Sequence, residues 1–167
     1  MLGPKERSAT GAEAAAVNTP APTTVPEAVR YSTDIFLSYK QNDGSDALAM
    51  ALYHELKPLD VWLDKKRGAE RSEAGMMAGV QGCRLFCAIL SPLYFGSQLC
   101  LLEIRKAIVE RKKIVLCLQF GSKFKVQEAL GWLPVEFSGL KSDELVMLHE
   151  DDDFMQVTIN KLRSRAQ

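Results

Sequence analysis

Short apolar runs alternate with stretches of helix-type spacing along the chain from about residue 31 onward. A run of roughly four to eight apolar residues bounded by turn residues is typical of a buried strand, whereas apolar residues at every third or fourth position indicate an amphipathic helix. We therefore expect strands at residues 34–39, 61–64, 84–90 and 114–120. Helices are expected between them, at about residues 45–57, 76–81 and 98–111.

The pattern is weaker beyond residue 120, where two segments, residues 133–137 and 145–148, are alternative candidates for a fifth strand. A closing amphipathic helix is expected at residues 154–163. The residues that this helix could place in the core are Phe154, Val157 and Leu162. Acidic residues 150–153 precede it, where negative charge is favourable to the positive end of the helix dipole. We prefer this role for the acidic run to a metal site.

Strands that alternate with helices predict an α/β protein with a parallel sheet. The short repeat favours a flavodoxin-like three-layer fold, in which about five parallel strands form a central sheet with helices on both faces. Ligands of such a fold bind at the carboxyl ends of the first and third strands. Here those ends are Tyr39, followed by the loop 40–45, and Ser91, followed by the loop 92–97. The helix at residues 98–111 begins at the same crevice and is expected to carry Glu103 in its first turn.

The first thirty residues have a different composition, with four of the seven prolines among alanines and threonines and almost no large apolar side chain. Such a segment cannot bury enough surface to offset the entropy of ordering it. We interpret residues 1–30 as a disordered tail and residues 31–167 as one domain.

Charge and cysteine content exclude several classes of function. Lys plus Arg and Asp plus Glu are both 21, so the chain lacks the overall positive charge typical of nucleic-acid binders, although a local basic patch is compatible with this balance. No apolar stretch approaches the roughly 20 residues of a membrane span, and the N-terminus does not resemble a secretory signal. The four cysteines form no CxxC pair and there are only two histidines. We expect no metal site and a reducing, cytoplasmic location.

Several catalytic motifs are also absent. The sequence contains no GxxxxGK[ST] phosphate loop and no GxGxxG after the first strand, which argues against an NTPase or a Rossmann oxidoreductase. His54 and His149 occur in contexts that do not support a Ser-His-Asp triad, and His54 is expected on the solvent side of its helix. A phosphoacceptor receiver domain needs an Asp at the end of the third strand, where this chain has Ser91.

Three blocks carry a resemblance: DIFLSYKQNDGS at residues 34–45, VWLD at 61–64 followed by a polar loop, and CRLFCAILSPLYFGSQLCLLEI at 83–104. In this order and spacing, the chain resembles a Toll/interleukin-1 receptor (TIR) domain. The first block is similar to the opening of TIR domains that hydrolyse NAD. Residues 97–103 are similar to the segment that holds the catalytic glutamate of those enzymes.

This resemblance implies cleavage of the nicotinamide–ribose bond of NAD+, giving nicotinamide and ADP-ribose or a cyclic form, with NAD+ as substrate and no cofactor. Glu103 matches the catalytic glutamate. The other residues that it implies around the substrate are Tyr39, Lys40, Gln41, Ser91 and Leu99. One carboxylate suits this reaction because nicotinamide departs from a cationic pyridinium as a neutral molecule, so the leaving group needs no general acid.

Other interpretations of these residues stay open. Glu103 could simply favour the helix dipole and pair with Lys106 on the helix surface. Leu99 stands where the NAD-hydrolysing enzymes have an aromatic residue, and Tyr94 or Phe95 could supply a ring instead. Trp62 is expected to pack in the core rather than bind.

The polar loop at residues 65–75 corresponds to the loop through which TIR domains assemble head to tail. Its candidate assembly residues are Lys65, Lys66, Arg67 and Gly75. The resemblance therefore implies self-association and other TIR domains as partners, in innate immune or cell-death signalling. The alternative function is a non-catalytic TIR adaptor or scaffold that acts through TIR–TIR assembly.

Overall fold

A computed structural model describes residues 31–119, 126–142, 144–148 and 152–167. The predicted tail at residues 1–30 and the first half of the acidic run at 150–153 lie outside the described residues. The prediction of a tail is therefore not tested.

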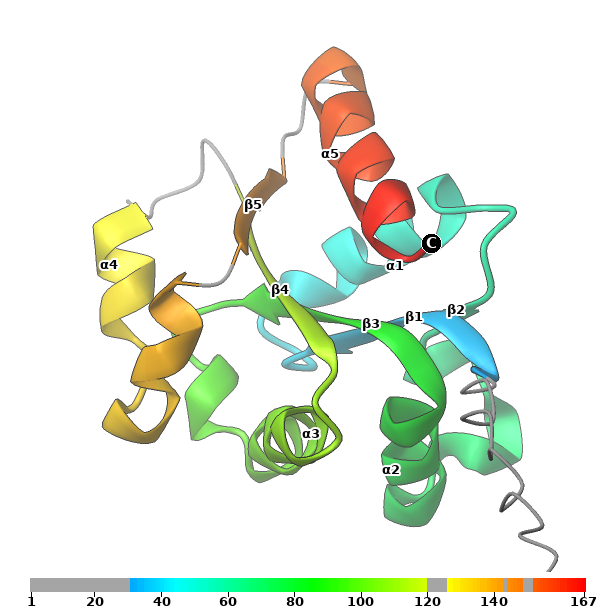
Figure 1. Ribbon diagram of the computed structural model, residues 1–167, viewed down its shortest axis with the longest axis horizontal. Helices are drawn as coiled ribbons and strands as arrows, with labels where there is room; N and C mark the ends of the chain where they lie inside the picture. Colours follow the sequence, from blue (N-terminus) through cyan, green and yellow to red (C-terminus); the bar gives the residue numbers. More distant parts are fainter. Residues whose placement is uncertain (1–30, 120–125, 143, 149–151) are drawn as a thin grey trace, which may run out of the picture.

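The centre of the molecule is a five-stranded sheet in the order β2-β1-β3-β4-β5, and all neighbouring strands are parallel (Figure 1). The strands are β1 (Thr33–Tyr39), β2 (Val61–Trp62), β3 (Cys83–Leu90), β4 (Lys113–Gln119) and β5 (Glu144–Leu148). This is the flavodoxin-like order, so the predicted fold class is confirmed. Of the two candidates for the fifth strand, the one at residues 145–148 is right. The other is wrong because most of it belongs to a 3₁₀ segment, Val135–Ser142.

Helices cover both faces of the sheet. α1 (Ser45–Glu55) and α5 (Asp152–Arg165) lie on one face, and α2 (Glu73–Gly82) and α3 (Gln98–Val109) on the other (Figure 1). A short helix that the sequence pattern did not predict, α4 (Val126–Gly131), precedes the 3₁₀ segment.

Two apolar clusters, one on each face, hold these layers together. In β3, Leu85 and Ile89 belong to the cluster under α1 and α5, whereas Phe86 and Leu90 belong to the cluster above α2 and α3. Successive side chains of a strand point to opposite faces. Both faces of β3 are therefore buried, which explains its nearly continuous apolar sequence.

Two helices begin where side-chain caps place them. The Ser72 hydroxyl accepts a hydrogen bond from the backbone N–H of Gly75 at 3.1 Å, so α2 begins three residues earlier than predicted. The Ser97 hydroxyl caps α3 in the same way. Because α3 begins at Gln98, Glu103 lies beyond the first turn, and the predicted first-turn position was wrong.

The closing helix α5 also differs in its core residues. Leu162 is buried as predicted, whereas Val157 is 57% exposed and Ile159 takes its place in the core. The side chain of Phe154 lies outside the described part of the chain.

Candidate functional site

A cavity of about 200 Å³ lies at the carboxyl ends of β1 and β2, beside the start of α3. Its lining comprises Leu37, Tyr39, Lys40, Gln41, Asn42, Trp62, Asp64, Met76, Ser97, Leu99, Cys100 and Glu103. The loop after β1 reaches it through a turn in which Gly44 has a φ of 95°, in the left-handed region that favours glycine. Four of the five residues predicted around the substrate line this cavity together with Glu103.

Glu103 is the buried acid of this cavity, with 5% of its surface exposed. Its Oε2 accepts a hydrogen bond from the Ser38 hydroxyl at 2.6 Å, and the Tyr94 hydroxyl lies 2.6 Å from the same Ser38 oxygen. Burial raises the pKa of Glu103 to about 8; the Ser38 hydrogen bond opposes this rise and the Asp64 charge adds to it. The Glu103 carboxyl is therefore poised to change protonation state near neutral pH.

The alternative role of Glu103 as a surface partner of Lys106 is wrong. The Lys106 ammonium instead bonds the Glu110 carboxylate, four residues further along α3, at 2.7 Å. The Glu103 carboxyl is buried and faces β1 through Ser38. Neither the helix dipole nor a surface ion pair accounts for an acid in this place.

A second carboxylate, Asp64, lines the same cavity and is 6% exposed. It accepts hydrogen bonds from the Tyr39 hydroxyl at 2.6 Å, from the Gln41 side-chain amide and from the backbone N–H of Lys65. Burial and Asp64 together raise the pKa of Tyr39 well above its usual value. In the sequence, Asp64 is visible only as the last residue of the VWLD block. The signal that could have located it is an acid two residues beyond a strand that neighbours β1.

Ser91 is the predicted substrate residue that does not line the cavity. It is buried, and its hydroxyl donates to the Asp43 carboxylate, so it holds the loop after β1. Lys40 does line the cavity, and its ammonium donates to the carbonyl of Gln41 at 2.9 Å.

Trp62 provides the aromatic surface that Leu99 lacks. It packs in the core as predicted, with its ring stacked on Phe36 at 4.3 Å, and it also lines the cavity, which the sequence analysis did not foresee. Neither Tyr94, which is fully buried, nor Phe95, which stacks on Phe137, is part of the lining.

Comparison with known families bears directly on this arrangement. Residues 35–156 match the family model described as a TIR domain. The chain belongs to the TIR domain family.

Solved TIR domains share the fold of this one at low sequence identity. The TIR domain of the Toll-related receptor TRR-2 from Hydra magnipapillata is 13% identical, with a TM-score of 0.55, covering 81% of this chain and 98% of that chain. The TIR domains of the activated Roq1 resistosome, which directly recognises the pathogen effector XopQ, are 20% identical, with a TM-score of 0.50, covering 81% and 84%.

A Clostridium botulinum CMP N-glycosidase, BcmB, is 18% identical, with a TM-score of 0.46 over 77% of this chain and 95% of that one. We draw no argument from so distant a likeness. No curated protein matches the sequence.

The predicted assembly loop of this TIR domain has regular local structure. Two 3₁₀ turns, Asp64–Lys66 and Gly68–Arg71, occupy it. Lys65 pairs with Asp46, and Arg67 pairs with Asp60 at 2.9 Å, while the Lys66 ammonium lies 5.8 Å from the centre of the Tyr53 ring. These contacts hold the basic residues along the surface of the domain.

Gly75 does not belong to that loop but to the first turn of α2. A Cβ atom on Gly75 would lie 2.2 Å from the carbonyl oxygen of Glu70. The residue therefore has a packing role of its own.

All four cysteines are buried and none of them forms a disulfide bond. The Cys100 thiol donates to the carbonyl of Tyr39 at 3.4 Å, and burial raises its pKa to about 12, as suits a structural residue. The described residues contain no group of three His, Cys, Asp or Glu side chains that could hold a metal ion. No helix in the described ranges is both long and apolar enough to cross a bilayer.

Proposed function

We propose that this TIR domain is an NAD+ glycohydrolase, which cleaves the nicotinamide–ribose bond with Glu103 as its catalytic carboxylate. The observation that carries the proposal is Glu103 itself, a buried acid that lines a cavity and is oriented by Ser38. A carboxyl removed from water needs a compensating interaction to ionise. The pyridinium ring of NAD+ carries a positive charge that supplies one.

Glu103 would act on the charge that develops at the ribose. As the bond to nicotinamide breaks, its electrons return to the pyridinium nitrogen, nicotinamide leaves neutral and the ribose carbon becomes cationic. A fixed carboxylate stabilises that cation more strongly in a site that excludes water than it would in bulk solvent. Water then bonds to the ribose carbon and loses a proton to solvent, giving ADP-ribose. Attack by a nucleophile within the substrate would give a cyclic product.

Ser38 keeps Glu103 in place throughout these reaction steps. A hydroxyl can donate to an ionised carboxylate and can accept from a protonated one, so the contact survives both protonation states. Tyr94 fixes the Ser38 hydroxyl from the other side at 2.6 Å. Asp64 orients Tyr39 and Gln41 in the same way, at the wall of the cavity.

The size of the cavity limits which part of NAD+ it can enclose. Cavities that bury a whole drug-sized ligand are typically about 300–1,000 Å³, whereas this one is about 200 Å³. We infer that the nicotinamide and its ribose enter, that Trp62 contacts the ring, and that the diphosphate lies near Lys40. Self-association, with activity favoured in the assembled state, is part of the proposal, as are other TIR domains as partners in cytoplasmic immune or cell-death signalling.

A non-catalytic adaptor or scaffold is the second candidate function. The observation that favours it is Leu99, an aliphatic side chain in the cavity lining where the NAD-hydrolysing enzymes place an aromatic ring. An adaptor would need the surface of the domain and not the acid within it.

The first experiment is nicotinamide release from NAD+ by purified protein at high concentration, free and clustered on beads. Glu103→Gln should abolish release, because the amide keeps the shape and loses the charge. Glu110→Gln is the matched control, since it removes an acid from the same helix outside the cavity and should retain the parental rate. No release by the parental protein in either state would favour the adaptor, and equal release by Glu103→Gln would remove Glu103 from the mechanism.

A further inference from the structure

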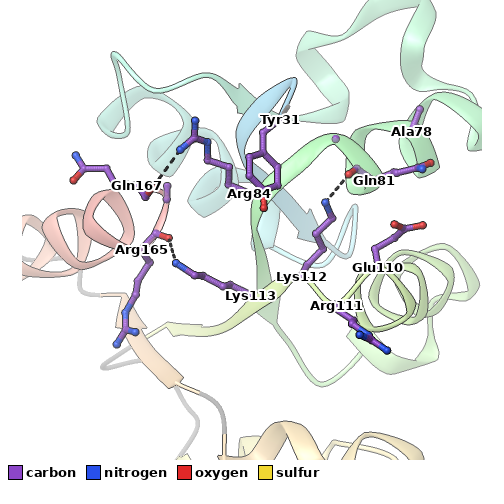
Figure 2. A pocket seen from close by; sticks show the side chains of 12 residues that line it. Tyr31, Ala78, Gln81, Arg84, Glu110, Arg111, Lys112, Lys113, Arg165 and Gln167 are labelled. Carbon is purple, nitrogen blue, oxygen red and sulfur yellow. Dashed lines mark hydrogen bonds between the residues drawn. The ribbon is translucent and has the colours of Figure 1, made fainter. Parts of the chain in front are cut away.

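A second cavity, of about 760 Å³, lies at the opposite end of the strands from the first cavity. It is found where β3 and β4 begin and where α2, α3 and α5 end. Figure 2 shows the basic side chains that gather in its lining. They are Arg84, Arg111, Lys112, Lys113 and Arg165. The one acidic side chain in the lining is Glu110, which pairs with Lys106 from outside the cavity. The main-chain oxygen of Gln167 accepts a hydrogen bond from Arg84 at 3.3 Å.

These cations outnumber the negative charge that faces them. Arg84 pairs with Asp34 at 3.7 Å, so its charge is compensated. Each helix C-terminus is equivalent to roughly half a negative charge, so the three helix ends together offset less than two of the charges on Arg111, Lys112 and Lys113. A positive excess is left at the cavity.

Two of these basic residues, Lys112 and Lys113, have a structural role. The Lys112 ammonium donates to the carbonyls of Gln81 and Cys83 near the end of α2, and the Lys113 ammonium donates to the carbonyl of Arg165 (Figure 2). Helix-end carbonyls carry only partial negative charge, so these lysines keep part of their attraction for an anion. Arg84 and Lys112 each lie 5.2 Å from the centre of the Tyr31 ring, so one aromatic ring contacts two of the cations.

The fold does not require an arginine at position 111, because the backbone there favours glycine. Its φ of 52° is left-handed, and the bonds from Arg111 N to Ile108 O and from Lys112 N to Ala107 O form the C-terminal motif in which glycine is the usual residue. Any residue with a Cβ costs stability there. Within the described residues, the exposed Arg111 side chain forms no hydrogen bond or ion pair. A side chain that is costly to the backbone and unpaired is explained best by a ligand.

We propose that this cavity binds a compact soluble anion with two or more phosphate groups, such as an inorganic oligophosphate or the triphosphate of a nucleotide. Arginine and lysine are the side chains that bind clustered phosphates. A concave site favours a small ligand over an extended one, and the chain as a whole has a net charge of zero, without the broad positive field that nucleic acid or an anionic membrane would need.

The test measures binding of inorganic tripolyphosphate by titration calorimetry at low and at physiological salt. The double variant Arg111→Gly with Lys113→Gln should bind on the order of a hundredfold more weakly, since two charge-assisted contacts, each about tenfold or more, are lost. Arg105→Gln with Lys161→Gln is the matched control. It also loses one arginine and one lysine from exposed helical positions outside the lining, and its affinity should stay within about twofold of the parental value.

Arg111→Gly alone separates a ligand-binding role from a structural one. It should raise the melting temperature and at the same time weaken tripolyphosphate binding, whereas Arg111→Lys should retain binding. Absence of binding at low salt would overturn the proposal, as would equal loss in the control variant, because that would indicate attraction by net charge only. Tighter binding to a DNA duplex or to vesicles that contain phosphoinositides than to tripolyphosphate would also overturn it.

Discussion

Ser38, Tyr94 and Glu103 form a chain of hydroxyl and carboxyl groups that runs from the interior to the cavity. In a low-dielectric interior such a chain sets both the direction and the protonation of its last member. Glu103 therefore depends on two residues that do not line the cavity. Its properties should change when those residues change, even though the cavity keeps its shape.

Removal of the Ser38 hydroxyl should move the pH dependence of NAD+ cleavage. The Ser38 hydrogen bond lowers the pKa of Glu103, so Ser38→Ala should raise that pKa and shift the acid limb of kcat/KM to higher pH. Tyr94→Phe keeps the bond to Glu103 and should shift the limb less. Identical profiles for Ser38→Ala and the parental protein would show that Ser38 does not orient the reacting acid.

Glu103 should also make stability depend on pH. Its pKa is about 8 in the fold against a reference value of 4.5, so the folded state binds more protons than the unfolded state between these values, and its contribution is lost as pH rises through about 8. Glu103→Gln should be more stable than the parental protein above pH 8, by roughly 1–3 kcal/mol. Near pH 4 the two should be alike. Denaturant unfolding at both pH values measures this, and a difference that does not change with pH would contradict the raised pKa.

At the level of elements, the close approach of α2 to β2 holds Trp62 at the cavity. A Cβ atom on Gly79 would lie 2.7 Å from the Trp62 indole nitrogen, so glycine at this position lets the helix and the ring share the space. Trp62 in turn stacks on Phe36 of β1. The wall of the cavity is therefore built from the contact of three elements.

Gly79→Ala should disturb this wall. An alanine in a helix usually adds stability relative to glycine, whereas here overpacking against Trp62 should cost about 1–3 kcal/mol and raise KM for NAD+. Gly131→Ala is a suitable control, because nothing lies within 4 Å of its added Cβ. Thermal unfolding and steady-state kinetics of both variants provide the comparison. A Gly79→Ala protein with parental stability and KM would show that α2 does not position Trp62.

Considered as a whole, the molecule shows which features a sequence pattern can predict. Continuous apolar runs predicted β1, β3 and β4 because strands buried on both faces have few polar positions. The order of strands followed from the strand–helix alternation, and Glu103 was located by the block of residues around it. The site was harder to predict from the sequence. Asp64 and Trp62 reach the cavity through the pairing of β2 with β1, which is a long-range contact and leaves no periodic pattern in the local sequence. Gly75 illustrates the same limit, since only its distance from Glu70 reveals its packing role.

The two ends of the described domain meet at the amino ends of the strands. The Arg84 guanidinium contacts both the ring of Tyr31, at 5.2 Å, and the carbonyl of Gln167, at 3.3 Å, while Glu103 lies at the opposite edge, about 20 Å away along strands that rise roughly 3.3 Å per residue. A tether at either end should therefore present the glutamate edge outward. Protein immobilised by an N-terminal or a C-terminal tag should cleave NAD+ at equal rates per molecule. A strong preference for one tag would mean that the tethered end reaches the reactive edge. The two ends of the described chain therefore lie on one side of the domain, and the cavity that contains Glu103 lies on the other.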